Sequence, residues 1–149
     1  MPIGRLTSCL FGAIAFFVLL PAVQALDDRG AKRAISKFLA SQKSAQGSTM
    51  AGEHVIADLN ADRKPDIVLI WHVLGATSSW PKLTIFLDQG RTYRTLTTNL
   101  TGEPKKLAVN GPTITVSTLM QGPRDARCCP TVKKQLKFRL VGRKLKALK

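Results

Sequence analysis

The chain has 149 residues, of which 44% are hydrophobic, and its 23 lysine and arginine residues outnumber 9 acidic residues. The formal net charge is +14 at pH 7. This length suits one domain with a modest hydrophobic core rather than several domains. The apolar run at residues 67–74 is far too short to cross a bilayer, so we expect no transmembrane segment in the mature chain.

Residues 1–25 have the features of a secretory signal peptide. Arg5 gives a positive start, residues 10–20 form an apolar core, and Val23 and Ala25 occupy the small-residue positions of a cleavage site. An uncleaved membrane anchor is the alternative, which the short core and the cleavage pattern disfavour. We therefore expect a periplasmic or secreted chain in which residues 26–149 form a single exported domain. Loss of Arg5 leaves 22 basic against 9 acidic side chains, a net charge of +13.

The first predicted element is a helix over residues 27–46, which turns Ile35, Phe38 and Leu39 to one face. Residues 44–53 have the composition of a loop. Strand patterns follow at residues 54–59, 67–74, 82–87, 92–98, 106–109, 113–119, 132–141 and 145–148. The run at 67–74 is apolar, as in a central strand that is covered on both faces. The sequence therefore predicts an α+β fold, in which the N-terminal helix packs on an antiparallel β-meander of about six to eight strands.

The segment ADLNADRKPDIVLIW has the spacing of a loop that binds a hard cation. Asp58, Asn60, Asp62 and Asp66 place oxygen atoms at positions 1, 3, 5 and 9, and the backbone carbonyl of Lys64 supplies position 7. These residues make Ca2+ the cofactor that the sequence suggests, in a structural rather than a catalytic role. The alternative is a tight turn between two strands, whose aspartates accept hydrogen bonds from backbone amides.

Two adjacent cysteines, Cys128 and Cys129, remain after Cys9 leaves with the signal peptide. In an oxidising compartment we expect a disulfide, either between the two or with another chain. A bond between neighbours closes a very short loop, so it would stiffen the turn rather than stabilise the whole chain. A zinc site would need two more ligands, and neither His54 nor His72 stands at a characteristic spacing. Thiol redox chemistry is the remaining alternative, although the usual C-x-x-C spacing is absent.

The loop motif and the cysteine pair together resemble a group of small exported bacterial proteins of poorly defined function. Their loop reads GDLNGDGKPD, similar to the DxNxDGxxD loop of FG-GAP and VCBS-like repeats, and a DPxCCPS segment follows near the end of the chain. Arg63 departs from this pattern where glycine is usual, and Leu69 stands where a carboxylate would complete an ion-binding loop. The resemblance implies a fold and an exported location, and it brings no activity with it. The matching residues are Asp58, Asn60, Asp62, Pro65, Asp66, Asp125, Cys128, Cys129 and Pro130.

The chain beyond Asp125 contains no acidic residue. Alternation over residues 132–141 sends Leu136 and Phe138 to one face and Lys137 and Arg139 to the other. An exported protein with such a basic surface meets acidic proteins and anionic envelope polymers or lipids, and we expect no nucleic acid among its partners. The expected partner-binding residues are Trp80, Lys133, Lys134, Lys137, Arg139, Arg143 and Lys144.

No serine stands in a nucleophile-elbow motif, and no pair of acids is visibly placed for glycosidic chemistry. The sequence thus favours a non-enzymatic periplasmic or secreted binding protein, such as an inhibitor or immunity-type protein, that engages an acidic partner. One alternative is an envelope-associated protein that binds anionic polymer or lipid. Another is a thiol-redox protein that uses the two neighbouring cysteines.

Overall fold

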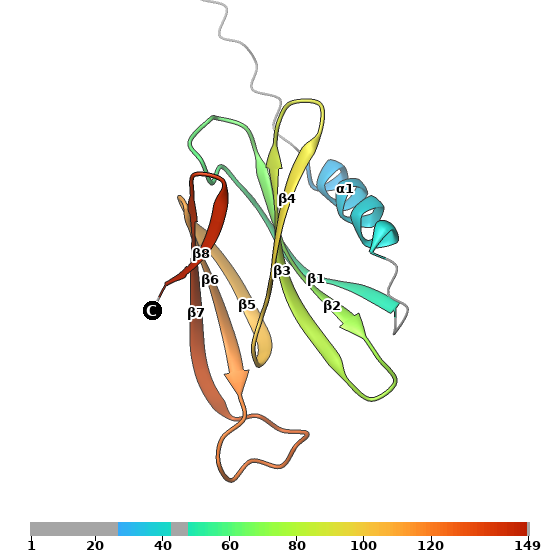
Figure 1. Cartoon of the computed structure of the whole chain (residues 1–149), viewed down its shortest axis with the longest axis vertical. Helices are drawn as coiled ribbons and strands as arrows, with labels where there is room; N and C mark the ends of the chain where they lie inside the picture. Colours follow the sequence, from blue (N-terminus) through green and yellow to red (C-terminus); the bar gives the residue numbers. More distant parts are fainter. Residues whose placement is uncertain (1–26, 43–47, 149) are drawn as a thin grey trace, which may run out of the picture.

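The computed structural model describes residues 27–42 and 48–148, and these contain one α-helix and eight strands (Figure 1). The predicted signal peptide lies outside the described residues. Within the described ranges, no helix has the length and apolar character that spanning a membrane requires. The elements are α1 (Asp28–Ser41), β1 (Ser48–Ala57), β2 (Asp66–Leu74), β3 (Ser79–Asp88), β4 (Tyr93–Asn99), β5 (Glu103–Asn110), β6 (Thr113–Met120), β7 (Val132–Val141) and β8 (Lys144–Leu148).

The strands form two four-stranded antiparallel sheets, one of β1–β4 and the other of β5–β8. Within each sheet the order of strands follows the chain. The main core contains side chains from both sheets, such as Ile70 and Ile85 from the first and Val116 and Phe138 from the second. The predicted α+β fold, a helix packed on one meander, was therefore wrong, because the fold is a pair of packed sheets with one short helix. The alternation of apolar and polar residues is the same in both arrangements, so it could not distinguish them.

The chain passes from the first sheet to the second at residues 100–102. Leu100 is buried, and its amide donates a hydrogen bond to the carbonyl of Pro81 at 2.9 Å. The hydroxyl of Thr118 donates to the carbonyl of Thr101 at 3.1 Å. Gly102 has a φ of 76°, and a Cβ atom added to it would lie 2.4 Å from the carbonyl oxygen of Leu119. Only glycine fits this passage without a shift of the neighbouring backbone.

Helix α1 covers the outer side of the first sheet, the side that faces away from β5–β8 (Figure 1). Ala31 and Ile35 are buried there against Leu69, Trp71 and Phe86. With the second sheet on one side and the helix on the other, β2 is buried from Asp66 to Trp71, which explains its uninterrupted apolar run. None of the described residues forms a helix on the outer side of the second sheet, and the strands of this sheet alternate between buried and exposed residues.

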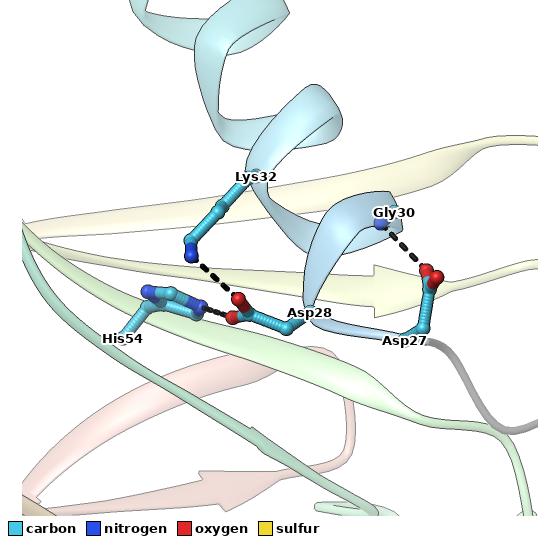
Figure 2. A network of polar contacts seen from close by, with 5 residues as sticks. All are labelled: Asp27, Asp28, Gly30, Lys32 and His54. Atoms are coloured by element: carbon cyan, nitrogen blue, oxygen red, sulfur yellow. Dashed lines mark hydrogen bonds and ion pairs between the residues drawn. The ribbon is translucent and has the colours of Figure 1, made fainter.

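Two neighbouring aspartates fix the start of α1 (Figure 2). Asp27 caps the helix, since its Oδ1 accepts a hydrogen bond from the amide of Gly30 at 2.7 Å. Asp28 accepts from Lys32 and lies 2.9 Å from Nε2 of His54 on β1, and these two partners lower the pKa of its carboxyl. The first turn of the helix is thus bound both to the next turn and to the sheet below.

The predicted boundaries at this end of the chain were partly wrong. The described helix ends at Ser41, short of the predicted residue 46. Residues 48–53, which the sequence suggested as loop, form the first half of β1. A register shift between Ala51 and His54 breaks the alternation there, and a Cβ atom on Gly52 would lie 2.9 Å from the carbonyl oxygen of Ile70. Because this pairing is irregular and contains a glycine, the residues do not show the alternation of apolar and polar side chains that indicates a strand.

A cross-sheet hydrogen bond joins the edge strands β1 and β5. Oε2 of Glu53 accepts from the amide of Leu107 at 2.6 Å. Each of these strands pairs with only one neighbour in its own sheet. The glutamate therefore satisfies an amide of an edge strand, which reduces the capacity of that edge to pair with another chain.

Replacement of Gly102 by alanine tests the passage between the sheets. We expect Gly102→Ala to lower the free energy of unfolding by about 2–4 kcal/mol, because positive φ and a backbone clash act together. Gly111→Ala is the matched control: its φ is 52° and nothing lies within 4 Å of the added Cβ, so the loss should be about 1 kcal/mol. Urea denaturation of both variants measures the difference, and equal losses would contradict this account.

Candidate functional site

The outer side of the second sheet carries a set of exposed cations. Residues paired directly across neighbouring strands point to the same side of a sheet. Thr113 pairs with Arg139, and Arg139 pairs with Lys146, so a hydroxyl and two cations form one row. Thr115 and Lys137 belong to the next row. We call this surface the basic face, and its cations are Lys106, Lys133, Lys137, Arg139, Lys144 and Lys146.

The structure gathers four of the seven predicted partner-binding residues on the basic face, namely Lys133, Lys137, Arg139 and Lys144. The other three lie elsewhere. Lys134 pairs with the buried Thr118 and so belongs to the inner side of β7, although its own side chain is exposed. Arg143 is exposed in the turn between β7 and β8.

Trp80 lies on the first sheet, far from the basic face in the fold. It is 46% exposed and pairs with Val73, whose side chain packs on the helix side of that sheet. A surface that included both Trp80 and the cations would have to extend around the molecule. A role of Trp80 in binding therefore stays a prediction that is separate from the basic face.

Two cations of the basic face, Lys106 and Lys146, were missing from the predicted set. Each stands at an alternate position of its strand, next to an inward residue: Leu107 is buried after Lys106, and Leu145 is half-buried before Lys146. This alternation was visible in the sequence. The pairing of their strands with β6 and β7, which brings them to the same surface, was not.

Among the residues that the structure describes, the acidic members of ion pairs are Asp28 and Glu103. Neither of them pairs with a cation of β7 or β8. Glu103 lies at one corner of the basic face, opposite Leu119, and pairs with Lys105. Arg139 stands directly opposite Lys146. Like charges in that position repel each other, which costs roughly 0.2–1 kcal/mol. The face thus keeps an uncompensated positive charge at some cost to stability.

The predicted ion-binding segment, residues 58–66, is a hydrogen-bonded loop between β1 and β2. Oδ1 of Asp58 accepts from the amides of Asn60 and Asp62 at 3.3 and 3.2 Å, and Oδ2 accepts from Arg63 at 2.9 Å. Oδ1 of Asp62 accepts from the amide of Lys64 at 2.9 Å. Arg63 has a φ of 64°, in the left-handed region that favours glycine. Backbone amides therefore occupy both oxygens of Asp58 and Oδ1 of Asp62, and Oδ2 of Asp62 accepts from the side-chain amide of Asn60 at 3.0 Å.

Asp66 has a different environment from the other predicted ligands. Its side chain is fully buried, and its two oxygens accept from the amides of Leu59 at 3.0 Å and Asp88 at 2.9 Å. Burial raises the pKa of this carboxyl, although the two amide hydrogen bonds oppose the rise. Asp66 thus ties the loop to the end of β3, a distance of 22 residues along the chain.

The structure brings four of the five predicted calcium ligands together in one loop and holds Asp66 apart from them. Asp58, Asn60, Asp62 and Lys64 lie in the exposed loop, whereas both oxygens of Asp66 bind amides beneath it. Across residues 27–42 and 48–148, no three His, Cys, Asp or Glu side chains are grouped so that they could hold a metal ion. Hydrogen bonds account for the shape of the loop, and calcium binding rests on the sequence pattern alone.

The cysteine pair lies in the CCP loop, residues 121–131, which connects β6 to β7. Asp125 closes this loop: Oδ2 accepts from the amides of Gly122 and Thr131, both at 2.7 Å, and Oδ1 accepts from the Thr131 hydroxyl at 2.8 Å. These bonds lower the pKa of Asp125, the Gly122 amide most.

Both cysteines are exposed at the end of the CCP loop, and their sulfur atoms lie at disulfide distance. The amide of Cys129 donates to the carbonyl of Ala126 at 2.9 Å, and Nε2 of Gln121 donates to the same carbonyl at 2.8 Å. The loop is therefore closed by hydrogen bonds that involve neither sulfur. Sequence reasoning assigned the closing role to the cysteines and missed Asp125, whose signal was the hydroxyl residue six positions later.

Replacement of Asp66 tests its role as the anchor of the 58–66 loop. We expect Asp66→Ala to lower the free energy of unfolding by about 2–5 kcal/mol, because two amides lose their acceptor in a dry environment. Asp62→Ala, at an exposed position of the same loop, should cost about 1 kcal/mol or less. Denaturant melts give both values, and a loss for Asp66→Ala no larger than that of the control would refute the anchor.

Replacement of Asp125 should open the CCP loop, whereas replacement of both cysteines should not. Trypsin cleavage after Arg124 or Arg127 is the measurement, and we expect it to be several-fold faster in Asp125→Ala than in Cys128→Ser/Cys129→Ser. The ionised carboxylate accepts these bonds, and they lower its pKa, so in the unaltered chain the loop is protected at the neutral pH at which trypsin acts. Faster cleavage of the cysteine variant would show that the sulfurs close the loop.

No family model, curated protein or solved structure matches the chain. The resemblance to exported proteins with a DxNxDGxxD loop and a CCP segment therefore stays a prediction, and the geometry of the described residues carries the functional argument.

Proposed function

We propose that this chain is an exported, non-enzymatic binding protein that recognises an acidic protein partner through the basic face. The observation that carries the proposal is the set of six cations on the outer side of the second sheet, of which those on β7 and β8 have no ion-pair partner among the described residues. An oppositely charged partner would supply the missing counter-charges and speed association. An inhibitor or immunity-type protein with this charge would cover an acidic surface of another protein.

Two apolar side chains favour a folded protein over a simple polyanion as the partner. Val141 is 46% exposed and pairs with Lys144, while Leu148 is 43% exposed and pairs with Lys137. Both therefore lie among the cations of the basic face. A polymer that offers only negative charge gains no binding free energy from Val141 and Leu148, whereas a protein interface combines apolar contacts with complementary charge.

The export of the chain is part of the same proposal and rests on the signal-peptide pattern of residues 1–25. An exported chain meets envelope and extracellular proteins, and this is where we expect the acidic partner. Anionic polymer or lipid of the envelope is the competing ligand, which the experiment below distinguishes.

Charge reversal on the basic face should abolish capture of the partner. Cross-linking in the native envelope, followed by mass spectrometry, should identify one dominant acidic protein joined to the unaltered chain. We expect Lys137→Glu/Arg139→Glu to weaken that complex roughly tenfold or more at about 0.15 M salt. Arg33→Glu/Lys37→Glu is the control, because it makes the same change of charge on exposed positions of α1, across the molecule.

Three results would count against the proposal. Equal weakening by the control pair would show a response to net charge alone. Recovery of only lipid or wall polymer, released as salt rises, would establish the envelope-binding alternative. A complex that the Lys137→Glu/Arg139→Glu variant keeps unchanged would place the interface elsewhere.

A further inference from the structure

The outer side of β6 carries a column of short hydroxyl side chains, Thr113, Thr115 and Ser117. We propose that this column is a trough that receives an extended acidic segment of the partner, with acidic residues at alternate positions. The inference rests on the proposed function, and it specifies the conformation and the spacing of the acidic residues that the basic face recognises.

The neighbours of the column make it a trough. On the β7 side, Thr113 stands opposite Arg139 and Thr115 opposite Lys137, so long cationic side chains flank short ones. On the β5 side, Thr113 stands opposite Asn110, Thr115 opposite the small Ala108, and Ser117 opposite Lys106. A chain lying along β6 would therefore have hydroxyl donors beneath it, cations along the β7 side and one further cation on the β5 side. Such a combination binds carboxylates by charge-assisted hydrogen bonds.

A hollow of about 350 Å3 lies at the Ser117 end of the trough. Gln135, opposite Ser117, adds an amide, and Lys105 and Lys133 bring cations to the lining. Leu119 also lines the hollow, as do Thr118 and Lys134, which belong to the inner side of the sheet. The hollow thus offers hydroxyl, amide and ammonium donors together, which suits a side-chain carboxylate.

A carboxylate of the chain itself already lies beside this hollow. Glu103 pairs with Lys105, one of the lining lysines, and occupies the corner of the basic face next to Leu119. An incoming carboxylate would compete with Glu103 for Lys105. Glu103 therefore weakens binding at this end of the trough, and its removal should strengthen it.

The spacing between the three hydroxyl residues of β6 favours a peptide with acidic residues at every second position. Successive outward residues of a strand are about 6.7 Å apart, and the same distance separates alternate side chains of an extended peptide. Acidic side chains at every second position would then meet Thr113, Thr115 and Ser117 in register. A peptide with the same acids in one block would place half of them on the side away from the trough.

Two synthetic peptides of equal length and charge test the trough by fluorescence anisotropy. One alternates glutamate and serine, and the other carries the same glutamates in a single block followed by the serines. We expect the alternating peptide to bind about tenfold more tightly to the full chain. Thr115→Val/Ser117→Ala should remove that preference while leaving the melting temperature nearly unchanged, and Glu103→Gln should raise the affinity several-fold.

The outcomes separate this inference from the proposed function. If both peptides bind equally and the hydroxyl variant binds like the unaltered chain, the trough is refuted. If Lys137→Glu/Arg139→Glu still abolishes binding in that case, the basic face remains the site of acid recognition. If that variant also binds normally, the proposed function fails together with the trough. A Glu103→Gln variant with lower affinity would contradict the competition at Lys105.

Discussion

A β-sheet has two faces, and the described part of the chain, residues 27–42 and 48–148, offers one helix to cover them. The two sheets cover each other on their inner sides, and α1 covers the outer side of the first. The outer side of the second sheet is left for solvent or for a partner. This constraint explains why β2 has an unbroken apolar run from Ile67 to Trp71, whereas β6 and β7 alternate. It also explains why the unpaired cations gather on one surface, since side chains on a solvent-facing side of a sheet do not have to pack in a core.

Several elements were visible in the sequence because their signals are local. The alternation of Leu136, Phe138 and Leu140 identified β7, and Asp27 marked the start of α1. The division into two sheets was not visible, because it depends on a three-residue passage around Gly102 rather than on any strand pattern. A wrong fold therefore followed from strands that were mostly placed correctly.

The candidate site shows the same division between local and non-local information. Lys133, Lys137 and Arg139 share a face of one strand, so alternation alone placed them together. Lys106 and Lys146 join them only through the register of neighbouring strands, which a single sequence does not encode in any simple pattern. Asp66 is the same residue type as Asp58 and Asp62, yet it is buried, and both of its oxygens accept hydrogen bonds from backbone amides. The residue type indicated which chemistry was available, and burial determined whether the side chain could use it on a ligand.

The way in which Asp125 closes the CCP loop bears on how the protein can be made and handled. The closing bonds need a carboxylate, two amides and a hydroxyl, all of which exist before any oxidation takes place. The loop that leads into β7 can therefore take its shape in a reducing compartment, and the basic face can form with it. A recombinant chain produced in the cytosol should present the same surface as one that has been exported.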